Sequence, residues 1–272
     1  MPGSTTRRAE PRRRALLGLA AAAFWLAVWW VVSLFVGQEL LVPSPATVLA
    51  TLVQLAGTAA FWQTTVVSLS RVLLGFLAGV VAGIAAAVLT TRYPAADALL
   101  SPLLRVVRAA PVASFIILAL VWIPTGRLPA FISFLMVVPV VWDSMAQGIA
   151  RQDRDLLEVA QVFGFGRWQT LRRVRIPLLL PFLATACTTG MGLAWKSGIA
   201  AEVISRPPIA VGSRLQDAKI YLETPEVFAW TITVVLLSLL LEGVLRWAAG
   251  RATTWLSAGP APAGEEAADA HA

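Results

Sequence analysis

The stretch EVAQVFGFGRWQTLRRVRIP, residues 158–177, is the part of the chain from which the rest can be interpreted. It contains four arginines, whereas the runs on either side of it, 128–146 and 178–200, are predominantly apolar. Uncompensated charges are costly in hydrocarbon, so this segment belongs outside the lipid. We expect it to be a cytoplasmic handle between two membrane-spanning helices, by which a soluble partner moves the membrane part.

The composition is that of an integral membrane protein. Hydrophobic residues make up 58% of the 272 residues and charged residues only 14%, which is far from the values of soluble domains. A bilayer core of about 30 Å needs roughly 20 apolar helical residues per crossing. The sequence therefore predicts an all-α integral membrane fold with about six transmembrane helices, at 15–36, 62–90, 109–123, 128–146, 178–200 and 227–248.

Basic residues divide unevenly between the connecting segments. Sixteen arginines fall on one side of the predicted membrane and four Lys or Arg residues on the other. Positively charged loops stay in the cytoplasm, so both termini are predicted to be cytoplasmic. This orientation explains the net charge of +7, and no nucleic-acid recognition motif is present. The preference for Arg over Lys suggests a GC-rich genome, so we expect a multi-pass protein of the bacterial cytoplasmic (inner) membrane.

The same orientation divides the chain into parts. Residues 1–14 form a basic cytoplasmic N-terminus, 15–250 form the transmembrane domain, and 251–272 form a cytoplasmic tail rich in Pro, Ala, Gly and acidic residues. Such a composition predicts disorder. The lone Cys187 lies inside the fifth run, so no intramolecular disulfide is expected. No His, Cys and carboxylate cluster suits metal binding or nucleophilic catalysis.

The first helix of the cytoplasmic segment, 151–177, is predicted from its cap and its apolar stripe. Asp153 or Asp155 can cap it. The stripe consists of Leu156, Leu157, Ala160 and Phe163.

Gly164 is predicted to end this helix, because glycine adopts the left-handed conformation that closes a helix. A second helical piece follows at 167–174, and Pro177 starts the fifth span, since proline is tolerated in a first turn. The segment could alternatively be a basic interfacial helix that binds anionic lipid headgroups. We favour force transmission, because a helix stopped by glycine and joined rigidly to a span suits it.

Residues 42–55 predict a short amphipathic helix on the outer surface. Ser44 is a suitable N-cap and Pro45 suits the first helical position. Val48, Leu49, Leu52 and Leu55 share one face. An ordinary connector packed on the spans fits this pattern equally well.

The second run carries glycines at four-residue intervals, namely Gly75, Gly79 and Gly83. Such a row lets another helix approach closely in lipid. The spacing does not distinguish a neighbour in the same chain from one in a second copy, and we expect the former first.

Several charges lie in or near the spans. Arg71 needs a partner, and Asp143, Glu202 and Glu242 are the candidates. Arg71 and Lys196 could line a path for an anionic solute, although both are interpreted first as salt-bridge or headgroup anchors. Asp143 alone is thin support for a proton relay.

The chain resembles the permeases of binding-protein-dependent ABC transporters. Glu158-Val159-Ala160, Gly164 and Val174-x-Ile176-Pro177 are similar to their EAA loop. The nitrate, sulfonate and taurine branch is resembled by four further stretches, VPSPATV from Val42, SLSRVLLGF from Ser68, RAAP from Arg108 and AEVI from Ala201. The sequence departs from the branch at Ile123-Pro124-Thr125-Gly126, where an aromatic residue and a glycine are usual.

This resemblance implies a type I importer permease of the MetI-like fold. It implies a second permease copy forming a homodimer, two cytoplasmic ATPase subunits and an extracytoplasmic solute-binding protein. The solute would be nitrate, a sulfonate, taurine or a related small compound. The residues that would couple to the ATPase are Asp155, Leu156, Leu157, Glu158, Ala160, Phe163, Gly164 and Pro177.

The chain itself is not expected to be an enzyme or to bind a cofactor or metal. A phosphate-binding loop needs Gly-x-x-x-x-Gly-Lys-Ser/Thr. The nearest match runs from Gly190 to Ser197 but has Trp195 in place of the second glycine. ATP is therefore expected on a partner chain. The alternative function is a secondary transporter driven by an ion gradient, which usually has ionisable groups at mid-membrane.

Overall fold

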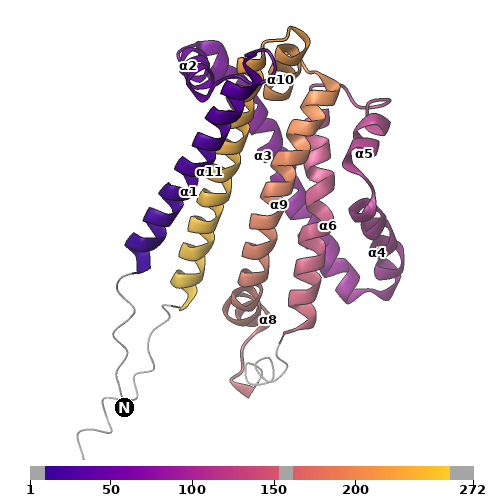
Figure 1. The fold of residues 1–272 in the computed structure, drawn as a ribbon. Helices are drawn as coiled ribbons and strands as arrows, with labels where there is room; N and C mark the ends of the chain where they lie inside the picture. The colour runs from indigo at the N-terminus through magenta and orange to yellow at the C-terminus, as the bar shows by residue number, and fades with distance from the viewer. Residues whose placement is uncertain (1–9, 153–161, 258–272) are drawn as a thin grey trace, which may run out of the picture. The chain divides into compact units, whose positions relative to one another are not determined.

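The computed structural model describes residues 10–152 and 162–257, and every regular element in these ranges is helical (Figure 1). The longer elements up to Ser205 are α1 (Glu10–Val36), α2 (Pro45–Ala56), α3 (Ala59–Arg92), α4 (Pro94–Ala109), α5 (Val112–Ala119), α6 (Leu128–Ala150) and α9 (Ile176–Ser205). The remaining elements are α8 (Arg167–Thr170), the π-helix η1 (Leu171–Arg175), α10 (Val211–Ile220) and α11 (Thr224–Ser257).

Contacts divide the described residues into two compact units. The first unit consists of the described residues up to Gln63 and of Arg214–Thr233. The second unit consists of the described residues between Thr64 and Ser213 and of those from Val234 onward. The second unit contains the features that bear on function.

Five of the predicted spans correspond to long apolar helices. Helices α1, α3, α6, α9 and α11 include stretches long and apolar enough to cross a bilayer. The apolar side chains of α1 are largely exposed, as expected of a surface that faces lipid. The described residues therefore contain five of the about six predicted spans. A sixth span is present if the bent helix pair α4 and α5 is counted as a single crossing.

That bent pair corrects the predicted third span, 109–123. The helix there is only α5, which has eight residues and spans about 12 Å, too short to cross a bilayer. It follows α4 at an angle of 105°. Ala110 is extended, with ψ 145°, because the residue before a proline is disfavoured in the helical region. Helix α4 itself was not predicted, although Pro94 stands in its first turn.

The helix that contains the fifth span begins earlier than predicted. Pro177 lies in the first turn of α9, but no break precedes it, and helical backbone runs from Arg167 to Ser205. The five-residue π-helix η1 ends at Arg175, two residues before Pro177. Proline cannot donate a backbone hydrogen bond and crowds the carbonyl four residues earlier. The wider π-turn accommodates both effects without ending the helix.

Helix α6 is the centre of the second unit, and the glycine row of α3 packs against it. A Cβ atom built on Gly75 would lie 2.1 Å from the carbonyl oxygen of Ala130. Built on Gly79 and Gly83, it would lie 2.7 Å from the Cβ atoms of Val137 and Val141. The row therefore faces a neighbour in the same chain. The Trp142 indole of α6 also donates to the hydroxyl of Thr90 at 3.0 Å.

Helix α9 runs beside α6 on another face (Figure 1). The Ser133 hydroxyl donates to the Ala194 carbonyl, and the Ser144 hydroxyl to the Phe182 carbonyl, both at 2.9 Å. At one end of the two helices a buried apolar cluster joins α5, α6 and α9, through Ile116, Ala119, Leu128, Ile132 and Ala201. These contacts fix α6 and α9 to each other along most of their length.

In the first unit, the predicted helix at 42–55 is present as α2. The Ser44 hydroxyl accepts from the Thr47 backbone N–H at 3.1 Å, so Ser44 is its N-cap, and Pro45 stands in the first turn. Val48 is buried, whereas Leu49 and Val53 are exposed.

Two helices continue beyond the predicted limits of the transmembrane domain, 15–250. Helix α1 begins at Glu10 and α11 continues to Ser257, seven residues into the stretch 251–272 that was predicted to be disordered. Neither Gly nor Pro occurs between Arg251 and Ala258, so this part of the sequence contains no residue that disfavours a helix strongly.

Candidate functional site

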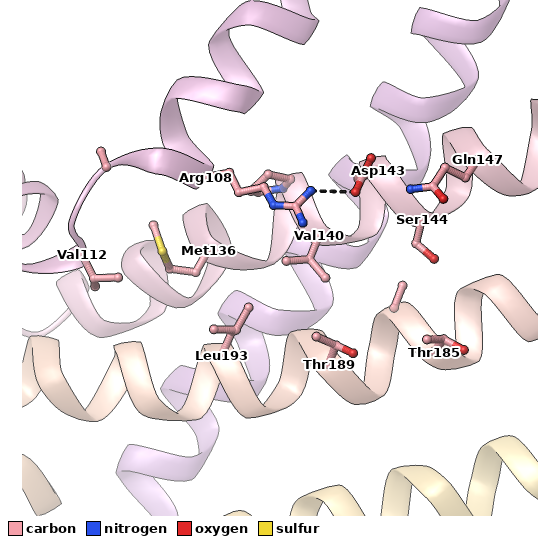
Figure 2. Close-up of a pocket in the computed structure, with 13 residues that line it drawn as sticks. Arg108, Val112, Met136, Val140, Asp143, Ser144, Gln147, Thr185, Thr189 and Leu193 are labelled. Carbon is pink, nitrogen blue, oxygen red and sulfur yellow. Dashed lines mark hydrogen bonds and ion pairs between the residues drawn. The ribbon is translucent and has the colours of Figure 1, made fainter.

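A cavity of about 380 Å³ opens between the end of α4, the start of α5, and helices α6 and α9. Figure 2 shows Arg108 of α4 and Asp143 of α6 on one wall and Leu193, Thr189 and Thr185 of α9 on the other. The lining set comprises Arg108, Ala110, Val112, Met136, Pro139, Val140, Asp143, Ser144, Gln147, Thr185, Ala186, Thr189 and Leu193.

One ion pair dominates the electrostatics of this cavity. Arg108 Nη1 lies 2.6 Å from Asp143 Oδ2, and the side chains are 60% and 36% exposed. Arg108 stands in the last turn of α4, where the negative end of the helix dipole favours a cation. Arg108 and Asp143 are the only charged residues among the thirteen that line the cavity, so the two charges together contribute no net charge.

The cavity wall changes character along its length. Polar side chains of Ser144, Gln147, Thr185 and Thr189 lie toward the same end as the ion pair, and Val112 and Met136 lie toward the other (Figure 2). The Thr185 hydroxyl donates to the Pro181 carbonyl at 2.9 Å, one helical turn earlier. The cavity thus offers a charged, hydroxyl-lined end and an apolar end.

A second polar cluster surrounds Glu202, which is fully buried near the end of α9. Its Oε2 accepts from the Ser68 hydroxyl at 2.9 Å and from the Gly212 N–H at 3.1 Å. Its Oε1 lies 3.6 Å from Arg71 Nη1, and the same nitrogen donates to the Ile209 carbonyl at 2.7 Å. The cluster fastens the segment after α9 onto α3.

The structure therefore separates the four charged residues singled out from the sequence. Of the three candidate partners of Arg71, Glu202 is the one that it contacts. Neither residue lines the cavity, and Lys196 is exposed on α9 and also lies outside the lining set. Only Asp143 borders the cavity. The anchoring interpretation of Arg71 thus agrees with its surroundings.

Sequence reasoning missed Arg108 as a cavity residue. It was counted only as one of the cytoplasmic charges, although the RAAP stretch that it begins was noted. The available signal was the Ala110-Pro111 pair, which ends α4 at Ala109 and leaves Arg108 at a helix end.

Three of the predicted coupling residues lie among the described residues. Gly164 has φ +71°, the left-handed conformation predicted for it. Phe163 is 74% exposed, and Pro177 lies in the first turn of α9. The other five, Asp155, Leu156, Leu157, Glu158 and Ala160, are outside the described residues.

Comparison with known proteins gives a consistent result. The profile of the family described as "Binding-protein-dependent transport system inner membrane component" matches residues 79–254. The taurine transport system permease protein TauC of Escherichia coli is 29% identical over 251 residues, which are 89% of this chain and 90% of TauC. The riboflavin transport system permease protein RibX of Chloroflexus aurantiacus is 30% identical, over 89% of this chain and 97% of RibX. The bicarbonate transport system permease protein CmpB of Synechococcus elongatus is 28% identical, over 69% of this chain and 67% of CmpB.

Proposed function

The chain belongs to the family of binding-protein-dependent transport system inner membrane components, and we propose that its cavity is part of the path that the solute takes across the membrane. As a member of that family it is the multi-pass permease subunit of an ABC importer for a small solute. The solute itself is a proposal. One of the relatives is named for riboflavin. Two others are named for the small charged compounds taurine and bicarbonate, and we propose on this basis a small polar solute of the nitrate, sulfonate and taurine kind.

One observation carries the mechanism, namely that a single helix joins the cytoplasmic turn to the cavity. The helix Arg167–Ser205 has 39 residues, begins just after Gly164, and contributes Thr185, Thr189 and Leu193 to the cavity wall. From Arg167 to Thr185 the helix extends about 27 Å. A displacement of its cytoplasmic end therefore moves the cavity wall.

ATP hydrolysis is assigned to a partner chain. We propose that two cytoplasmic ATPase subunits grip the segment 151–177 of a permease homodimer and that closure of the ATPase pair tilts the attached helices. An extracytoplasmic solute-binding protein would deliver the solute, and the assembly would lie in the cytoplasmic membrane of a bacterium. This permease chain needs no cofactor in such a scheme.

Apolar contacts should dominate ATPase docking. Val162 and Phe163 are among the most exposed apolar side chains of the described residues. An exposed salt bridge contributes only about 0–1 kcal/mol, so the arginines of α8 and η1 add orientation more than affinity. Burial of apolar side chains such as Phe163 contributes about 1.5–3 kcal/mol each.

The test compares two glycines of the same turn. Gly164 has φ +71° and Gly166 has φ −64°, and among the described residues no atom lies within 4 Å of a Cβ built on either. Gly164→Val forces a β-branched residue into the left-handed region at about 1–3 kcal/mol, whereas Gly166→Val meets no such strain. We expect solute uptake to fall at least several-fold in Gly164→Val alone, with membrane abundance unchanged in both variants.

Equal uptake by the two variants and the natural chain would remove the role of this turn. A loss of membrane abundance in Gly164→Val would show a folding defect, and uptake would then be compared per molecule in proteoliposomes. Uptake equal to that of Gly166→Val on this scale would again contradict the proposal.

A further inference from the structure

We propose that the cavity binds a small zwitterion, a molecule that carries both an acidic group and an ammonium group, by exchange of partners with the Arg108–Asp143 ion pair. In the bound state Arg108 pairs with the acidic group of the solute and Asp143 with its ammonium group. This inference rests on the proposed function, because it names the class of solute that the same cavity accepts.

Charge balance is the first argument. The pair contributes one positive and one negative charge, and no other lining residue is charged. A simple anion on Arg108 would leave Asp143 beside it without a partner, which adds repulsion and a net charge in a membrane-spanning segment. A zwitterion gives each side chain an opposite charge and leaves the net charge at zero.

Access is the second argument. Both side chains are partly exposed, at 60% and 36%, and they meet through a single close contact, Nη1 to Oδ2. A guanidinium has five N–H donors in a planar fork, so Arg108 has donors left over with which to receive an acidic group before it releases Asp143. An ion pair sealed in the core would offer no such route.

The third argument is how firmly the helices that carry the two side chains, α6 and α4, are held. Asp143 stands on α6, whose next residue, Ser144, is hydrogen-bonded to the Phe182 carbonyl of α9. Arg108 stands one residue before Ala109, the end of α4, and two before the extended Ala110 at the 105° bend. The acid is therefore held on the rigid α6–α9 pair, and the arginine on a helix end next to a break. Separation of the two side chains needs movement of only that end.

The nearby side chains suit a small solute. Gln147 and Thr189 border the charged end, and the apolar residues Val112 and Leu193 border the other. A cavity of about 380 Å³ is at the small end of the range of ligand pockets. A short carbon chain between the two charged groups would lie along the hydroxyl-lined wall of α9.

The test uses matched pairs of small molecules that differ in the ammonium group alone. The full-length chain in lipid nanodiscs is titrated with taurine and with isethionate, in which a hydroxyl replaces the ammonium, and likewise with β-alanine and 3-hydroxypropionate. Binding is followed by saturation-transfer difference NMR, which detects weak association. We expect at least one zwitterion to bind about tenfold or more tightly than its hydroxyl analogue.

Variants then identify the groups responsible. Asp143→Asn should bring the zwitterion and its hydroxyl analogue to equal affinity, and Arg108→Gln should weaken both. Glu242→Gln, which alters another carboxyl group paired with an arginine of the same unit, Arg246 at 3.9 Å, should change neither. The double variant Arg108→Asp with Asp143→Arg restores a structural ion pair with its charges exchanged between α4 and α6.

Each outcome decides the matter. Equal binding of zwitterions and hydroxyl analogues to the natural chain, or binding of none of the four, overturns the zwitterion site. If variants of Arg108 and Asp143 lose stability but still bind zwitterions more tightly than hydroxyl analogues, as the natural chain does, the ion pair has only a structural role. ATP-driven uptake by the assembled transporter does not depend on these results, so its presence alongside negative binding would refute this inference and leave the proposed function standing.

Discussion

Glu202 shows how one buried carboxyl group organises a chain segment. It accepts hydrogen bonds from Ser68 and Gly212 and pairs with Arg71. Gly212 must be glycine for this approach, because a Cβ there would lie 2.5 Å from the Cβ of Glu202. Sequence alone identified Glu202 as a candidate partner of Arg71, because a charge within a span needs one.

We predict that Glu202→Ala destabilises the chain far more than Glu202→Gln. The alanine leaves Arg71 and two buried donors without their acceptor, and removal of one member of a buried pair costs about 3–5 kcal/mol. The glutamine keeps an acceptor oxygen and the side-chain volume. Melting temperatures of the purified variants in detergent provide the measurement, with Glu242→Gln as the control. Equal melting temperatures for the alanine and glutamine variants would show that the hydrogen bonds contribute nothing.

At the scale of elements, the contact between α3 and α6 depends on the absence of side chains. Gly75, Gly79 and Gly83 let the α6 backbone and its valines approach closely, and small residues are what allow such approach in lipid. Near the C-terminal end of α3, the hydrogen bond from Trp142 of α6 to Thr90 fixes the contact between the two helices. The helix pair is therefore a rigid support on which the cavity wall of α6 is mounted.

We expect Gly79→Leu to destabilise the chain by about 1–3 kcal/mol or more, because the added atoms overlap Val137. Gly243→Leu is the matched control, since no described atom lies within 4 Å of a Cβ on that helical glycine. Membrane abundance and melting temperature of both variants check this prediction. A Gly79→Leu protein as stable as the Gly243→Leu protein would mean that α3 does not pack on α6 as described.

Two elements differ from their sequence-based predictions for opposite reasons involving proline. Pro111 breaks the predicted third span, because Ala110 before it is extended and the chain turns by 105°. Pro177 lies in the first turn of α9, as predicted. The helical backbone nevertheless continues before it, because the π-turn at η1 accommodates its missing donor. The residue is the same in both places, whereas the backbone before it is extended at Ala110 and π-helical at η1.

At the scale of the whole molecule, transport driven by ATP and transport driven by an ion gradient require different structural features of this chain. The continuous helix Arg167–Ser205 joins the turn at Gly164 to the cavity, as a partner-driven transporter requires. The ionisable groups Arg71 and Glu202 are committed to an internal contact, so they do not form a ready ion pathway.

We therefore predict that uptake in proteoliposomes containing the assembled transporter requires ATP hydrolysis and continues when a protonophore removes the proton gradient. A partner ATPase that lacks its phosphate-binding lysine should abolish uptake. Uptake that survives this replacement and stops with the protonophore would identify a secondary transporter. The solute-binding protein must be present in both measurements, since its omission would stop delivery in either case.

The parts that could be predicted from sequence are those with local causes. Ser44 caps α2 and Gly164 takes a left-handed conformation, because each depends on its own chemistry. Five of the span positions follow from apolar length, whereas the third did not. The Arg108–Asp143 pair could not be predicted, because its members are 35 residues apart and meet only after the bend at Ala110. Orientation in the membrane stays a prediction from the arginine distribution. The coupling roles of all eight residues between Asp155 and Pro177 named for them also stay predictions.

The continuity of the helix Arg167–Ser205 has a thermodynamic consequence. A coupling free energy between two sites acts equally in both directions. If a protein gripping the cytoplasmic end changes the affinity of the cavity for a solute, then occupancy of the cavity must change the affinity of that protein by the same factor. Binding of solute in the cavity would thus change how tightly the partner protein holds the permease, and the stiffness of this one helix would be enough to couple the two sites.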